Sequence, residues 1–253
     1  MTGCFGLSIV IMLLCTCYYI WAFPKQQPAK PICTRTICTM YKKISTMHSG
    51  DLLFVRKRRH PSWTDSVLCN YLAGHVILVL RYKKKVYGID FSPDNNDIPI
   101  DTSHIKYIQH YTHHTSNVKD KSGLRIFSLL QYVYDSLNIY QSEYTVYTCK
   151  HVCKRHMHIQ RTLFTCLLLK HIAHYHYIYP SLNQQLIMYV YYCYNIPHTN
   201  TQLYSNCCMF AYDYVSKIMQ HIDMPSKKRK RTFYGVELMT WLDDTRCYDK
   251  RVF

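Results

Sequence analysis

Apolar residues after position 50 come first in short runs and later at helical spacing. Three runs rich in β-branched and aromatic residues predict buried strands over residues 51–56, 74–81 and 86–91. The lysines at 83–85 separate the second run from the third, and they predict a charged hairpin turn between two antiparallel strands. A further strand is predicted over residues 144–148.

Helical spacing dominates the second half of the chain. Apolar residues three or four positions apart predict helices over residues 163–178, 206–221 and 236–242. Residues 124–137 predict a helix or a strand that passes into a helix. Because the strands come early and the helices late, the pattern predicts an α+β fold.

The N-terminal segment is apolar and uncharged. Residues 3–23 number about 21, enough for a helix to cross a hydrocarbon core of about 30 Å. Tyr18, Tyr19 and Trp21 lie near its end, where interfacial aromatic residues are common. We therefore expect a single-pass membrane anchor. Lysines and arginines follow this segment and none precedes it, which predicts a cytoplasmic C-terminal domain.

A signal peptide is the alternative for this segment, and its cleavage would give a secreted protein. The absence of basic residues before the apolar centre argues against it. Residues 24–45 contain three prolines and predict a linker, so residues 46–253 are expected to form one catalytic domain.

The net charge of the chain indicates which partners it could bind, and it says less about how the chain folds. Of 253 residues, 31 are basic and 15 are acidic, a formal net charge of +16, whereas 48% are hydrophobic. The hydrophobic content excludes a disordered chain, and the charge favours anionic partners. Lys227, Lys228, Arg229, Lys230 and Arg231 form a basic run that could bind an anionic surface; no specific nucleic acid is expected.

The 13 cysteines predict thiols rather than a disulfide framework. Their number is odd, and a chain of this length buries a core without disulfides. Residues 149–158 hold five possible zinc ligands, but no second ligand pair follows at the spacing of structural zinc sites. No phosphate-binding loop or dinucleotide motif is present, so we expect neither a metal nor an organic cofactor.

Three residues stand out as a candidate catalytic set. His75 is a polar residue in an apolar strand, and Asp90 lies on the strand across the hairpin. Cys207 lies in the first turn of the helix over 206–221, directly after Ser205 and Asn206, and either of these two residues is a natural N-cap. Paired strands place His75 and Asp90 side by side.

These three residue types together are suited to nucleophilic catalysis. A helix N-terminus and a neighbouring imidazole both stabilise a thiolate, and free first-turn N–H groups can bind an oxyanion. A carboxylate behind the imidazole fixes its tautomer and orientation. The set therefore predicts a nucleophile, Cys207, a base, His75, and an orienting group, Asp90.

The motifs resemble the circularly permuted branch of the NlpC-type papain-like superfamily. The chain has Gly-Asp at 50–51, Gly-His-Val at 74–76, Val-Tyr-Gly-Ile-Asp at 86–90 and a Cys-x-x-Phe motif at 207–210. That branch includes bacterial amidase-like proteins, poxvirus relatives and the lecithin retinol acyltransferase group. The resemblance covers roughly residues 46–245, although the third residue of its site is often Glu.

The resemblance implies an antiparallel sheet that carries the histidine and packs on a helix that carries the cysteine. It also implies a membrane-associated thiol hydrolase, a cysteine peptidase or amidase, that works through a thioester. A lipid acyltransferase or phospholipase with the same fold is the first alternative. A catalytically inactive membrane protein that binds a partner is the second. The substrate would be a peptide, an amide or a lipid ester.

Overall fold

The computed structural model describes several stretches of the chain, and these form an α+β fold, which confirms the predicted fold class. The segments 3–23 and 227–231 lie outside them. Within the described stretches, no helix has the length and apolar character that crossing a membrane requires. The described residues are 33–56, 75–91, 124–150, 157–173, 184, 206–221, 235–245 and 247–252.

The centre of the fold is a six-stranded sheet in which every neighbouring pair is antiparallel. The strand order is β4-β3-β2-β1-β5-β6, which puts β1 and β2 in the middle. The strands are β1 (Leu52–Arg56), β2 (His75–Tyr82), β3 (Lys85–Phe91), β4 (Leu124–Ser128), β5 (Glu143–Cys149) and β6 (Tyr248–Val252).

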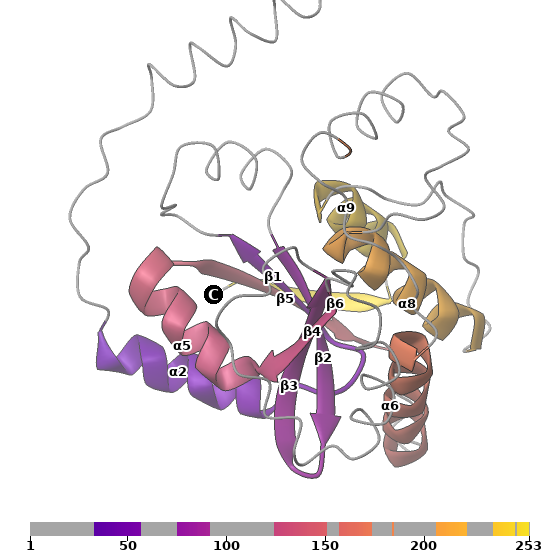
Figure 1. Ribbon diagram of the computed structural model, residues 1–253, viewed down its shortest axis with the longest axis horizontal. Helices are drawn as coiled ribbons and strands as arrows, with labels where there is room; N and C mark the ends of the chain where they lie inside the picture. Colours follow the sequence, from indigo (N-terminus) through magenta and orange to yellow (C-terminus); the bar gives the residue numbers. More distant parts are fainter. Residues whose placement is uncertain are drawn as a thin grey trace, which may run out of the picture.

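Helices cover both faces of this sheet (Figure 1). One face packs against α2 (Thr34–Ser45) and α5 (Leu129–Tyr140). The other packs against α6 (Met157–Ala173), α8 (Cys207–His221) and α9 (Gly235–Thr245). The central strands are consequently buried on both sides.

Alternation along the strands divides the core into two layers. Leu52 and Phe54 of β1 face the layer under α6, α8 and α9, whereas Leu53 and Val55 face the layer under α2 and α5. Successive side chains of a strand point to opposite faces, and here both faces are apolar. This explains why the sequence of β1 is a continuous apolar run rather than an alternating one.

Gly50 sets the position of β1 against its neighbours. Its φ angle of 98° lies in the region that glycine adopts most easily, and its N–H donates to the carbonyl of Val79 at 3.3 Å. A Cβ at this position would lie 3.0 Å from the ring of Phe164 on α6. The Gly-Asp turn therefore allows the sheet and α6 to approach closely.

The predicted strands before residue 92 and the predicted helix at 206–221 are confirmed within one residue at each end. The lysines form the expected turn, with Lys83 and Lys84 both at positive φ. Residues 124–137 contain both predicted elements, because β4 passes directly into α5. Ser128 caps that helix by accepting from the N–H of Gln131.

The linker prediction does not describe residues 34–45, which form α2. Ile37, Met40, Tyr41 and Ile44 recur at the 3–4 spacing of an amphipathic helix, and Met40 and Ile44 are buried in the core. The folded domain thus begins before residue 46. The prolines that indicated a linker all lie at or before residue 31.

Strand β6 has no counterpart among the predicted elements. Its first residue is buried and its other four are exposed. Because it pairs only with β5 at the edge of the sheet, its sequence carries charges instead of alternating apolar residues.

Candidate active site

The sheet brings His75 and Asp90 together on one of its faces. His75 begins β2 and Asp90 lies near the end of β3, one residue beyond the facing pair Leu78–Ile89. Their positions are diagonal across the antiparallel pair, and diagonal neighbours on one face are within reach of long side chains. The imidazole Nε2 lies 2.5 Å from Asp90 Oδ2.

Arg125 holds the other side of the same carboxylate. It faces Asp90 directly in the register of β3 and β4. Its Nε donates to Asp90 Oδ1 at 2.8 Å and its Nη2 donates to Oδ2 at 2.6 Å. Asp90 is fully buried, so this bidentate contact and the imidazole together compensate for its loss of hydration.

Sequence reasoning missed Arg125. The signal was present, because Arg125 interrupts the apolar residues Leu124, Ile126 and Phe127. A charged residue inside a short apolar strand usually has a buried partner. The ambiguity between strand and helix at this point hid which residues would share its face.

Helix α8 places Cys207 next to the start of β2. Cys207 is its first residue, and the Asn206 Oδ1 accepts the N–H of Met209 at 2.9 Å. Of the two N-cap residues that the sequence allows, Asn206 is therefore the one that caps the helix. The helix is held below this point by Phe210, whose ring stacks on Phe91 of β3 at 6.2 Å between centroids.

The Cys207 thiol contacts three groups. His75 and the backbone N–H of Val76 both stabilise its ionised form, and its Sγ lies 3.9 Å from the Sγ of Cys208. Cys207 is partly exposed, whereas Cys208 is buried. The structure thus links Cys207, His75, Asp90 and Arg125 in one continuous chain of polar contacts.

Within this chain of contacts, each charged group stabilises the charged form of its neighbour. Burial by itself lowers the pKa of His75, but the Asp90 carboxylate outweighs it and raises that pKa to about 9. Burial by itself raises the pKa of Asp90, but the net shift is downward because of His75 and Arg125. At neutral pH the imidazole is protonated and the carboxylate is ionised.

The two adjacent thiols have opposite ionisation. The hydrogen bond from Cys208 lowers the pKa of the Cys207 thiol well below its ordinary value, and so do His75 and the N–H of Val76, against the effect of burial. The same contact raises the pKa of Cys208 well above its ordinary value. Cys207 is therefore the thiolate of the pair, and Cys208 remains a thiol that donates to it.

The described residues contain no group of three or more His, Cys, Asp or Glu side chains placed to hold a metal ion. Most of the Cys- and His-rich segment 149–158 lies outside them. Cys149 is described and is buried at the end of β5.

Comparison of the chain with protein-family models, with curated proteins and with solved structures gave no match.

Proposed function

We propose that this protein is a cysteine hydrolase in which Cys207 attacks the carbonyl carbon of an amide or ester. The observation that carries the proposal is the contact chain Cys207–His75–Asp90–Arg125 at the N-terminus of α8. A thiolate paired with an imidazolium is the form in which cysteine acts as a nucleophile.

In the first half of the proposed reaction, the Cys207 thiolate bonds to the carbonyl carbon. The carbonyl π electrons move to oxygen, and the backbone N–H of Cys207 stabilises that oxyanion. As the carbonyl re-forms, the bond to the leaving group breaks and His75 gives the leaving group its proton. The products are a thioester on Cys207, a free amine or alcohol, and a neutral His75.

In the second half, neutral His75 takes a proton from water while the oxygen bonds to the thioester carbon. Collapse of the second tetrahedral species releases a carboxylic acid and returns the Cys207 thiolate with the protonated imidazole. Asp90 keeps the imidazole oriented in both halves, and Arg125 keeps Asp90 ionised.

The order of these elements supports membership in the permuted papain-like superfamily that the motifs resemble. His75 lies on a strand that precedes the Cys207 helix, and that helix packs against β2 and β3. We further propose that residues 3–23 anchor the domain to a membrane, as their apolar length predicts.

Thiol alkylation across pH 4–9, resolved by peptide mass spectrometry on the full chain, tests the proposal. Cys207 is expected to react fast well below pH 8 and to lose this advantage in His75→Ala. The exposed Cys166 serves as the internal reference. Equal pH profiles for Cys207 and Cys166 would overturn the thiolate–imidazolium pair.

A second measurement separates chemistry from a merely reactive thiol. The wild-type chain is incubated with activated acyl esters and then probed for a hydroxylamine-sensitive adduct. We expect an acyl group on Cys207 that is released to water, and none in Cys207→Ser. An adduct that is stable to water but passes to an added lipid alcohol would assign an acyltransferase instead.

A further inference from the structure

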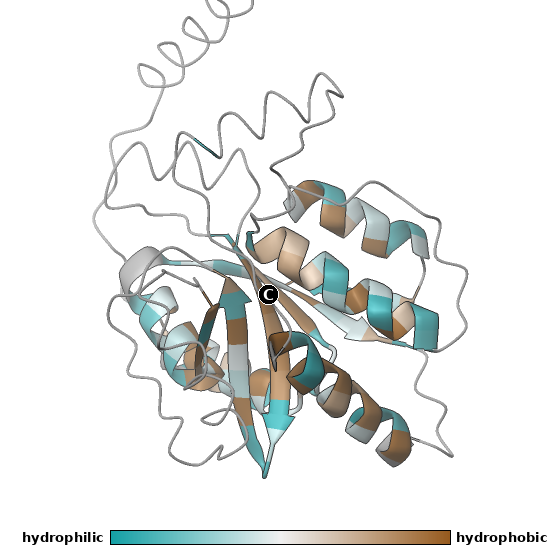
Figure 2. Cartoon of the chain, turned by 45° about the vertical axis from the view of Figure 1, so that its right-hand side comes forward, coloured by the Kyte–Doolittle hydropathy of each residue, from teal (hydrophilic) through white to brown (hydrophobic). Residues whose placement is uncertain are grey.

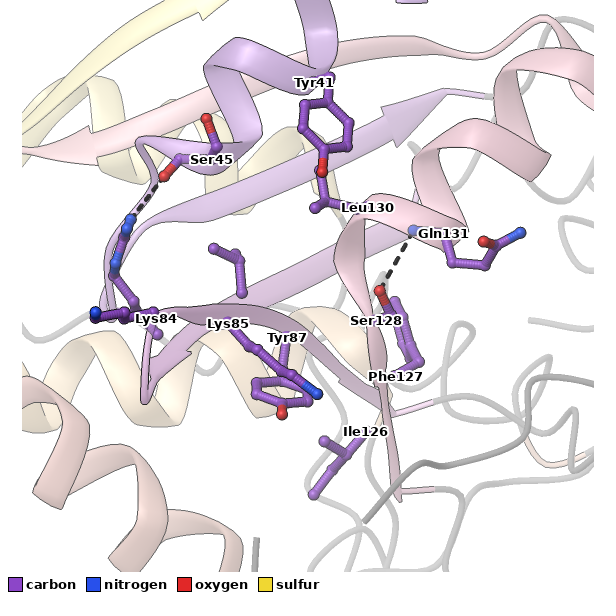
Figure 3. Close-up of a pocket in the computed structure, with 12 residues that line it drawn as sticks. Tyr41, Ser45, Lys84, Lys85, Tyr87, Ile126, Phe127, Ser128, Leu130 and Gln131 are labelled. Atoms are coloured by element: carbon purple, nitrogen blue, oxygen red, sulfur yellow. Dashed lines mark hydrogen bonds between the residues drawn. The ribbon is translucent and has the colours of Figure 1, made fainter. Parts of the chain in front are cut away.

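A second site lies at the opposite end of strand β2 from the thiol. A cavity of about 540 Å³ opens beside the β2–β3 hairpin, between α2 and the start of α5 (Figure 3). That volume is in the range of small-molecule sites. His75 and Arg81 are separated by six residues of β2, which is about 20 Å at the rise of a strand. The cavity therefore lies away from His75 and the Cys207 thiol, although Phe127 in its wall lies against Arg125 of the candidate site.

One wall of this cavity is basic. Arg81, Lys84 and Lys85 line it, and none of the described lining residues is acidic, although Gln131 of the lining donates to Asp135. The Arg81 Nη1 donates to the carbonyls of Ser45 and Met47 at 2.7 and 2.9 Å, which fixes the guanidinium against the end of α2. An anion entering the cavity would meet three positive charges, and one of them is already immobilised.

The rest of the cavity is largely apolar. Val86, Phe127 and Leu130 contribute to it, and Val86 and Phe127 are also part of the buried core. Figure 3 shows Leu130 and Tyr41 on the side of the helices, opposite the lysines of the hairpin. In Figure 2 the tip of the hairpin is hydrophilic, whereas the strands above it are apolar. Polar and apolar walls thus meet in one cavity.

The hairpin turn adds an independent observation about the lysines. Lys83 and Lys84 have φ angles of 45° and 68°, and such turns normally use Asn and Gly at these positions. Residues with a Cβ are disfavoured in this conformation. Lys84, which lines the cavity, therefore occupies the turn against the local conformational preference.

From these observations we infer that the cavity binds an anionic amphiphile, a carboxylate or phosphate head with an apolar tail. Lys84 and Lys85 would contact the head, and Val86, Phe127 and Leu130 would contact the tail. Such a ligand could come from solution or from a membrane leaflet, since both supply the same chemistry. This inference does not rest on the proposed hydrolase activity.

Equilibrium dialysis of the full chain with radiolabelled dodecyl phosphate tests the inference. Dodecanol lacks the charge and inorganic phosphate lacks the tail, so both are expected to bind at least about tenfold more weakly. Equal affinity for dodecanol or for inorganic phosphate would overturn the amphiphile site.

Paired variants of equal charge locate the bound probe. Lys84→Gln with Lys85→Gln is expected to weaken binding of dodecyl phosphate about tenfold or more. Lys42→Gln with Lys83→Gln removes the same charge from residues that do not line the cavity, and it should leave binding within about twofold. An equal loss in both pairs, or no loss in either, would overturn the inference; circular dichroism checks that both variants fold.

Two further arms complete the design. Cys207→Ala should bind dodecyl phosphate like the wild type, and loss of binding there would place the probe at the thiol and overturn the second site. Flotation with phosphatidylglycerol vesicles, compared between the two lysine pairs, identifies the source. If flotation depends on Lys84 and Lys85, the ligand is a leaflet lipid. If flotation does not depend on them but dodecyl phosphate still binds in dialysis, the ligand is a soluble amphiphile.

Discussion

At the scale of single residues, the central feature of the site is the buried, ionised carboxylate of Asp90. Asp90 has no exposed surface, and an isolated carboxylate in that position would be protonated or would destabilise the fold. Two cations, Arg125 and the His75 imidazolium, make its ionised form the stable one. Arg125 thereby acts on Cys207 through two intermediates, as a positioning residue without contact to the nucleophile.

Replacement of Arg125 by leucine should raise the pH at which Cys207 becomes reactive. Without the guanidinium, Asp90 binds a proton more easily, His75 loses its partner charge and the thiolate loses the imidazolium. Unfolding in urea should become easier by about 3 kcal/mol, because a buried charge loses a partner. The pH profile of Cys207 alkylation gives the first result and circular dichroism the second.

Arg125→Lys is the matched variant, since it keeps the charge but cannot make the bidentate contact. It should restore most of the alkylation profile. If Arg125→Leu lowers stability while the profile of Cys207 stays in place, Arg125 has a structural role only.

At the scale of elements, the first turn of α8 connects folding to the site. The Asn206 side chain satisfies the N–H of Met209, and this leaves the earlier N–H groups of the turn without a partner inside the helix. The sequence predicted both the helix and its cap, because capping is a local interaction between neighbours in the chain. The sequence could not place α8 against β2, since that contact joins residues more than a hundred positions apart.

Asn206→Ala should lower the free energy of unfolding by about 1 kcal/mol through loss of the cap. Asn206→Asp should restore this stability, because aspartate caps equally well. The added carboxylate beside Cys207 should nevertheless raise the pKa of the thiol and slow its alkylation at neutral pH. Urea unfolding and alkylation rates of both variants provide the test. Identical alkylation rates in wild type and Asn206→Asp would contradict the electrostatic account.

At the scale of the whole molecule, burial of titratable groups makes stability depend on pH. Asp51 precedes β1, is buried, and accepts the N–H of His48 at 2.8 Å. Burial raises its pKa to about 7, against the effect of its backbone donors and of Arg161 and Arg251. The folded chain then binds a proton at Asp51 up to about pH 7, whereas the unfolded chain releases it near pH 4.

The contribution of Asp51 to stability is therefore complete below about pH 4 and is lost as the pH rises to 7. Asp51→Asn should remove this dependence, so its unfolding free energy relative to wild type should rise by roughly 3 kcal/mol between pH 4 and 7. His48 titrates in the same window, because burial lowers its pKa to about 4, and the difference between the two proteins cancels its effect. Urea unfolding at pH 4, 5.5 and 7 measures the difference in unfolding free energy between the two proteins. A difference that stays constant with pH would contradict the raised pKa of Asp51.

Features that depend on neighbours in the chain could be predicted from the sequence. Apolar runs gave the central strands, the lysine turn gave the hairpin, and Asn206 gave the start of α8. The hairpin also fixed His75 and Asp90 on adjacent strands, since pairing across a short turn leaves few registers. Three of the four residues in the contact chain followed from such local patterns.

Contacts between distant segments could not be predicted in this way, because they depend on packing in three dimensions. Arg125 reaches Asp90 because β4 pairs with β3, and the Cys207 thiol reaches His75 because α8 packs across β2. Helix α2 was missed although its apolar residues have helical spacing, because the prolines before it indicated a linker. Strand β6 has no apolar pattern of its own, since it is held by pairing at an edge. Local sequence sets what each segment can form, whereas the burial of charge and of apolar surface between segments selects their partners.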